Sequence, residues 1–183
     1  QTMSPELLDS PATIRLVVSN NRLVEAAGAI EQLLHYPYGC AEQTSSAMLP
    51  WLAIKDIKSA VPSLNKTDAE IAKAVQKGAD RLLSMQARSG GIGYWPSAET
   101  PQLWTTAQAG MALVLASQSG ANVPPARLAS LLRYLSKELR SENDDVDDFT
   151  QMARCFACYT LALGGKAERA YHDVLFQQRA TLS

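Results

Sequence analysis

The chain has 183 residues, of which 46% are hydrophobic and 19% charged, and its net charge is -1. This composition is typical of a globular domain with a real core, and it excludes a disordered chain and a strongly basic nucleic-acid-binding surface. No apolar run reaches the roughly 20 residues of a membrane-spanning helix, and three cysteines are too few for a disulfide scaffold. The chain starts at Gln1 with no visible signal peptide, so we expect a piece of a longer or processed protein.

The first predicted element is a β-strand at residues 12–19 (ATIRLVVS), where apolar side chains alternate with others. Everything after it has helical periodicity, interrupted at glycine and proline. A capping box at Thr67-Asp68-Ala69-Glu70 marks one helix start. That helix stops at a loop, residues 89–93, whose three glycines permit positive φ. The remaining helices are predicted at about residues 23–35, 42–59, 103–119, 127–140, 148–163 and from 167 onward.

Three similar segments, AIEQLLHY from Ala29, ADRLLSMQ from Ala79 and SLLRYLSKEL from Ser130, recur at a spacing of about 50 residues. Such a period indicates tandem helical hairpins. They either stack into an open solenoid or close into an α/α toroid, and chance similarity between amphipathic helices is an equal alternative. The predicted class is therefore all-α with a short N-terminal strand.

The segment Gly39-Cys40-Ala41-Glu42-Gln43 opens the second helix. A cysteine there is most often a small buried residue and a glutamine a solvated one. However, free backbone N–H groups at a helix start favour a thiolate and can bind an oxyanion. The spacing of three residues also brings the Cys40 Sγ to the side-chain carbonyl of Gln43. Attack with loss of ammonia would give an internal thioester, an acyl donor far stronger than an amide.

Aromatic residues near this segment are candidates for keeping such a bond dry. Tyr36, Tyr38, Trp51 and Trp104 have this role in our interpretation, and plain core packing is equally compatible with them. Glu42 is expected to complement the helix dipole.

The motif PYGCAEQTSS resembles the thioester motif, Gly-Cys-x-Glu-Gln, of the α2-macroglobulin and complement superfamily. Tyr-Pro-Tyr-Gly before the cysteine, the strand ATIRLVVS and the loop SGGIGYWPS are similar to the bacterial α2-macroglobulins. The resemblance covers about residues 5–163. It implies an α/α-toroid thioester domain of six helical hairpins, of which this chain supplies about half. We therefore expect residues 1–20 to end a preceding β-rich domain or linker, and residues 21–183 to begin the toroid.

The resemblance further implies a protease trap and not an enzyme. Gln43 would supply the acyl group and Cys40 the leaving group, with Gly39, Glu42, Tyr36, Tyr38 and Trp104 in support. A lysine amine or another nucleophile of an attacking protease would be the acceptor. The resemblance also implies other domains of the parent protein, a periplasmic lipoprotein of a Gram-negative bacterium, and association with a peptidoglycan synthase. We expect no cofactor, metal or nucleic acid.

Histidine distinguishes members of this superfamily, because some use a distant one to direct the acyl group to hydroxyls. Residues 148–163 contain none, and His35 and His172 lie elsewhere. We therefore expect amine acceptors.

Other motifs carry weaker hypotheses. Cys155 and Cys158 form a Cys-x-x-Cys within a predicted helix, for which we favour core packing over a local disulfide, and a disulfide over a metal site. The acidic run 142–148 lacks the order of a calcium loop and is interpreted as solvated. The alternatives to a thioester domain are a helical toroid enzyme with a nucleophilic Cys40, and a helical interaction module in which the bond never forms.

Overall fold

The computed structural model describes residues 30, 32, 34, 39–57, 66–141, 147–177 and 179. These residues form the helices α2 (Ala41–Ile57), α3 (Asp68–Ser84), α4 (Leu103–Gln118), α5 (Pro125–Leu139), α6 (Asp148–Leu163) and α7 (Arg169–Gln177). Most boundaries lie within two residues of those predicted. The all-α class is confirmed, whereas the strand predicted at residues 12–19 lies outside the described residues.

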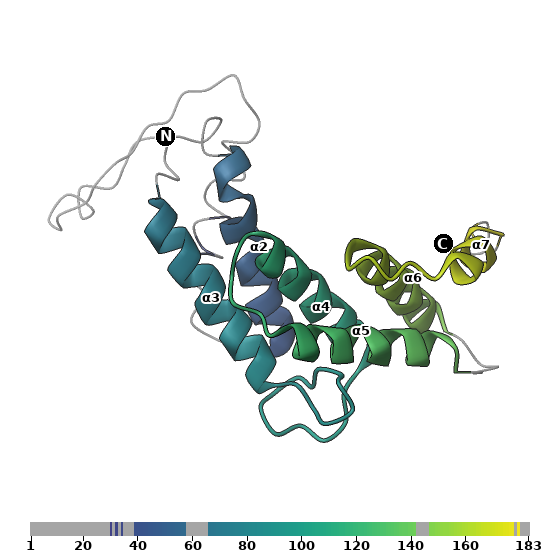
Figure 1. Cartoon of the computed structure of the whole chain (residues 1–183). Coiled ribbons are helices and arrows are strands. Elements are labelled where there is room, and N and C mark those ends of the chain that lie inside the picture. The colour runs from purple at the N-terminus through teal and green to yellow at the C-terminus, as the bar shows by residue number, and fades with distance from the viewer. Residues whose placement is uncertain are drawn as a thin grey trace, which may run out of the picture.

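Helix α4 is the centre of the fold, since it contacts α2, α3, α5 and α6 (Figure 1). Its sequence is apolar or small on every side, and nine of its residues are buried, as a helix surrounded by others requires. Gly110 allows this close packing. A Cβ there would lie 2.7 Å from Leu131 Cδ2 of α5 and 3.0 Å from Thr160 Cγ2 of α6.

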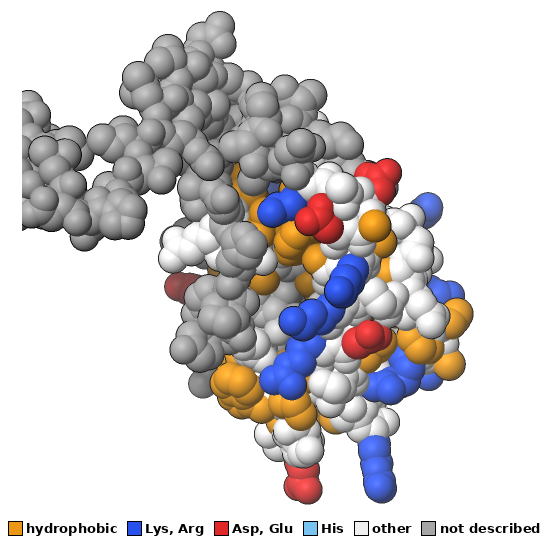
Figure 2. Space-filling model, turned by 90° about the vertical axis from the view of Figure 1, so that its left-hand side faces the viewer, with side chains coloured by type: hydrophobic (Ala, Val, Ile, Leu, Met, Phe, Trp, Pro, Cys, Tyr) orange, Lys and Arg blue, Asp and Glu red, His pale blue; other side chains and the backbone are white. Residues whose placement is uncertain are grey.

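Helices α3 and α5 each bury one apolar face. The buried residues of α3 are Ile71, Val75, Ala79, Leu82 and Leu83, and those of α5 are Leu131, Leu132, Leu135 and Leu139. The opposite face of α3 carries exposed Lys73, Lys77 and Arg81. Figure 2 views the side on which α3 lies in Figure 1, and Lys and Arg side chains form a row across it.

The capping box predicted at the start of α3 is confirmed. The Glu70 N–H donates to Thr67 Oγ1 at 3.2 Å, and the Thr67 N–H donates to Glu70 Oε2 at 2.8 Å. These two bonds satisfy backbone groups that a helix start otherwise leaves unpaired.

The connection between α3 and α4 folds back on itself through an isolated antiparallel bridge between Gln86 and Ile92. Of its three glycines, Gly90 alone has a positive φ, +98°. Gly91 and Gly93 are needed for space, since Cβ atoms there would lie 2.5 Å from Pro101 Cβ and 2.4 Å from Ala98 Cβ. The sequence predicted that glycine permits positive φ in this loop, and Gly90 is the glycine of the three that uses it.

No helix among the described residues is both long enough and apolar enough to span a bilayer.

Candidate functional site: the start of helix α2

Cys40 directly precedes α2, so it is the N-cap residue and Gln43 is the third helical residue. The Gln43 N–H donates to Cys40 Sγ at 3.5 Å, and the Cys40 N–H donates to Gln43 Oε1 at 3.3 Å. This reciprocal pattern is a capping box with a thiol and an amide in place of the usual hydroxyl and carboxylate. The sequence predicted that the two side chains meet, but not that they cap the helix.

The capping box has a chemical consequence. It holds the sulfur and the carboxamide on the same side of the first turn, and both are half-buried. The Cys40 N–H at Gln43 Oε1 is placed to stabilise negative charge on that oxygen. An N–H donor thus lies at the Gln43 side-chain carbonyl, and the Cys40 sulfur lies at the backbone N–H of the same residue.

Two segments distant in sequence hold this helix start in place. From α3, Arg81 Nη2 donates to the Gly39 carbonyl at 3.1 Å. From the α3–α4 connection, the Tyr94 carbonyl accepts the Ala41 N–H at 3.0 Å, and the Tyr94 hydroxyl lies 3.5 Å from Glu42 Oε1. Glu42 therefore contacts Tyr94 in addition to lying in the first turn, where it complements the dipole.

Gly39 is constrained by what surrounds it. A Cβ at this position would lie 3.1 Å from Thr44 Oγ1 and 3.6 Å from Arg81 Nε. The first distance is tight, so a side chain here would displace Thr44 or the guanidinium. Glycine therefore permits the close approach of α3 to the cysteine.

A polar link from α4 supports the next turn of α2. Gln108 Nε2 donates to Ser46 Oγ at 3.1 Å, and Gln108 Oε1 is buried with no hydrogen-bond partner among the described residues. Ser45 is fully buried, and its hydroxyl donates to the Ala41 carbonyl at 2.7 Å. Sequence reasoning identified neither this link nor Arg81. The SGGIGYWPS loop did carry a signal, since its similarity to the bacterial proteins drew attention to the segment containing Tyr94.

Comparison with known proteins identifies the family of the chain. The family model of the A-macroglobulin TED domain matches residues 13–171, most of the chain. The chain belongs to the A-macroglobulin TED domain family.

Bacterial relatives support this result. The α2-macroglobulin of Escherichia coli strain K12 is 34% identical over 133 residues, which are 69% of this chain and 8% of that protein. A native E. coli α2-macroglobulin structure, from domain MG7 to the C-terminus, aligns with TM-score 0.72 and 27% identity. It covers 86% of this chain and 26% of the solved chain. Salmonella α2-macroglobulin reacted with methylamine aligns with TM-score 0.71 and 28% identity, over 86% and 11% of the two chains. This TED domain thus spans a small part of its relatives, and its helices form part of an α/α toroid.

The aromatic residues expected to shield the site are placed only in part. Tyr36 and Tyr38 lie outside the described residues of the TED domain. The Trp104 indole packs on two rings of α6, with centroids 5.7 Å from Phe149 and 5.3 Å from Phe156. Trp51 packs against the core, with Lys66 Nζ 6.0 Å from its ring centroid. A shielding role for Trp104 therefore stays a prediction.

Cys155 and Cys158 lie inside α6, away from either end. Burial raises the pKa of both thiols, and for Cys158 it does so to about 11 with further contributions from Cys155 and Glu168. Such thiols stay protonated near neutral pH, which agrees with the packing role that the sequence favoured. Within the described ranges, no group of three or more histidine, cysteine or acidic residues is arranged to hold a metal ion.

The acidic run before α6 is described only at its end, because residues 142–146 lie outside the described residues. Asp147 caps α6 by accepting the Thr150 N–H at 2.7 Å, and this hydrogen bond lowers the pKa of its carboxyl. His172 is exposed on α7, and His35 lies outside the described residues.

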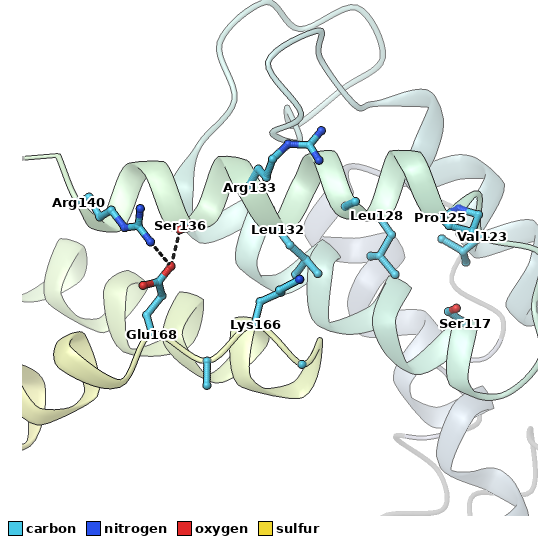
Figure 3. Close-up of a pocket in the computed structure, with 13 residues that line it drawn as sticks. Ser117, Val123, Pro125, Leu128, Leu132, Arg133, Ser136, Arg140, Lys166 and Glu168 are labelled. Atoms are coloured by element: carbon cyan, nitrogen blue, oxygen red, sulfur yellow. Dashed lines mark hydrogen bonds and ion pairs between the residues drawn. The ribbon is translucent and has the colours of Figure 1, made fainter.

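A pocket of about 810 Å³ lies between α5 and the α6–α7 connection (Figure 3). Glu168 accepts hydrogen bonds there from Arg140, at 2.8 Å, and from Ser136, while Arg133 points away. The hydrogen bond from Ser136, followed by Arg140, lowers the pKa of Glu168. This carboxylate joins the start of α7 to α5, and neither Cys40 nor Gln43 lines the pocket.

Proposed function

We propose that Cys40 and Gln43 form an internal thioester and that the domain serves a protein that traps proteases covalently. The observation that carries the proposal is the reciprocal pair of hydrogen bonds between these two residues. Membership of the TED family supports it, as does the relative whose structure was solved after reaction with methylamine.

Formation of the bond is an acyl transfer. The Cys40 thiol gives up its proton, its sulfur attacks Gln43 Cδ, and negative charge collects on Oε1. The intermediate then collapses with breakage of the Cδ–Nε2 bond, and the nitrogen leaves as ammonia with the thiol's proton. The Cys40 N–H would stabilise the charged oxygen.

In trapping, the thioester is the acyl donor and a new nucleophile displaces the Cys40 sulfur. A lysine amine of the protease adds to the same carbonyl, the carbon–sulfur bond breaks, and the Cys40 thiol is regenerated as an amide forms. Each domain reacts once, so the protein is an inhibitor consumed by its target and not an enzyme. Direct attack by an amine needs no acyl-imidazole step, and residues 148–163 contain no histidine to provide one.

The setting of the whole protein is part of the same proposal. We place it in the periplasm as a lipoprotein, with further domains beside the TED and a peptidoglycan synthase as neighbour. The support is the resemblance to the bacterial α2-macroglobulins. Release by osmotic shock, membrane association and co-purification of a synthase test these points separately.

The decisive experiment is the intact mass of freshly purified protein before and after methylamine, with thiols counted in parallel. A live thioester gives a mass one ammonia below the sequence value. Methylamine then raises the mass as one new thiol appears, and Cys40→Ala removes both signals. A full sequence mass with an intact amide at Gln43 would refute the proposal, whereas glutamate at position 43 would mean that the bond formed and was hydrolysed.

A further inference from the structure

One peptide group joins the reacting residues to α3. The carbonyl of the Gly39–Cys40 peptide accepts a hydrogen bond from Arg81 Nη2 at 3.1 Å. The N–H of the same peptide donates to Gln43 Oε1 at 3.3 Å. A charged donor at one end of this peptide and the acyl oxygen at the other end therefore form a continuous chain of hydrogen bonds.

Such chains are cooperative, because each bond polarises the next. A guanidinium on the carbonyl oxygen withdraws electron density from the amide and makes its N–H a stronger donor. Hydrogen bonds from charged groups are also stronger than neutral ones. The Arg81 contact therefore strengthens the hydrogen bond to Oε1 as negative charge develops there.

The contact also fixes the direction of the N–H. Rotation of the Gly39–Cys40 peptide plane would turn the N–H away from Oε1. Glycine at position 39 leaves this plane without side-chain restraint on its N-terminal side, and the guanidinium lies against the same residue, with Nε 3.6 Å from where a Cβ would be. Arg81 thus supplies a restraint that glycine lacks.

We infer that Arg81 is a positioning residue for the thioester, acting through the Gly39–Cys40 peptide on the oxyanion that forms at Gln43 Oε1. This inference rests on the proposed function. It adds that one exposed arginine of α3, 42 residues from Gly39 in sequence, sets the rates at which the bond forms and is opened.

The test compares Arg81→Met with Lys77→Met in the intact protein. Both changes remove one positive charge from the exposed face of α3, one turn apart, and replace it with an unbranched helix-forming side chain. Lys77 is the matched control. The readouts are the fraction of molecules with the ammonia deficit and the rate of thiol release by methylamine per intact thioester.

Loss of an oxyanion donor costs on the order of a hundredfold in rate or more. Because Arg81 acts through a peptide, we expect release about tenfold slower in Arg81→Met, with melting temperature equal to that of Lys77→Met. The expected tenfold effect corresponds to about 1.4 kcal/mol of activation free energy. A release rate within about twofold of that of Lys77→Met would overturn the inference.

Arg81→Lys separates this role from the complement that a cation offers at the end of α3. Lysine keeps the charge and can donate a hydrogen bond to the Gly39 carbonyl, but it lacks the planar fork, so its rate should lie between those of wild type and Arg81→Met. A lysine variant no faster than Arg81→Met would also overturn the inference. If wild-type protein shows neither the deficit nor methylamine-dependent thiol, the proposed function itself fails, which is a separate result.

Discussion

Helices α2 and α3 both begin with a capping box, but the side chains that form it differ. At α3, Thr67 and Glu70 exchange hydrogen bonds of 3.2 and 2.8 Å. At α2, Cys40 and Gln43 exchange the same two bonds at 3.5 and 3.3 Å. The backbone geometry that stabilises one helix start would, with a thiol and a carboxamide, place a nucleophile beside a carbonyl carbon.

The two helix starts differ in their surroundings as well. The Thr67 box is exposed to solvent. The Cys40 box is half-buried and is held by Arg81 from α3 and by Tyr94 from the α3–α4 connection. A hydroxyl and a carboxylate need no protection from water, whereas a thioester does. Capping geometry is therefore local, whereas the contacts that hold the Cys40 capping box come from elsewhere in the fold.

The largest expected effect comes from replacing one residue of the Cys40–Gln43 capping box by a residue that can still cap the helix but cannot form a thioester. Cys40→Ser and Gln43→Glu each retain a side chain that can cap, and serine is a preferred N-cap residue. We expect complete loss of the ammonia deficit and of methylamine-dependent thiol, measured by intact mass. Hydrogen exchange of the first-turn amides of α2 should change by less than about fivefold, the equivalent of about 1 kcal/mol. Exchange faster than this would show that the covalent bond, and not the cap, holds the helix start.

The next largest effect is a difference in alkylation rate between Cys40, at a helix start, and Cys158, inside a helix. Cys158 is 4% exposed and its pKa is raised to about 11, so at about pH 8 only on the order of one thiol in a thousand is ionised. After methylamine treatment we expect Cys40 to be alkylated about a hundredfold faster than Cys158, measured by peptide mapping. Equal labelling would contradict the packing role of the α6 pair.

Thr67→Ala removes the cap from α3 alone and should cost about 1 kcal/mol locally. The expected result is about fivefold faster hydrogen exchange at the first-turn amides of α3, with no change in α2. Thr67→Ser, which keeps the hydroxyl, is the control. Unchanged exchange in the alanine variant would mean that packing, and not the box, holds this helix start.

The smallest effect is a pH dependence that the two boxes should not share. Hydrogen bonds from the Thr67 side chain and backbone lower the pKa of Glu70 below 4.5. A lowered carboxyl pKa contributes stability above the unfolded pKa, and this is lost as pH falls through the folded pKa. The Thr67 amide NMR shift should therefore follow the titration of Glu70. The Cys40 amide shift should not follow the titration of Glu70, because its acceptor on Gln43 does not titrate. A change at Cys40 with the same midpoint and size as at Thr67 would remove this distinction.

Part of the candidate site could be predicted from the sequence because it is local. The spacing of Cys40 and Gln43 at a helix start was enough to predict that these two residues interact, and the resemblance of Gly-Cys-Ala-Glu-Gln to the thioester motif indicated the family. The Thr67 box and the start of α6 were equally accessible, since capping residues act within four positions of the chain. The roles of Gly91 and Gly93 could not be predicted in this way, because each leaves space for a packed side chain, Pro101 or Ala98, and neither has a positive φ.

The sequence by itself determined where the helices begin and end, and it determined the pairing of Cys40 with Gln43, because both depend on interactions within one turn. Only the tertiary structure decided which groups hold that turn. Arg81 and Tyr94 lie about 40 and 50 residues from their partners, and Trp104 contacts α6. These contacts follow from α2, α3 and α6 packing around α4. An amphipathic pattern shows that a helix buries one face, but the neighbour that covers it is chosen when all the helices pack together.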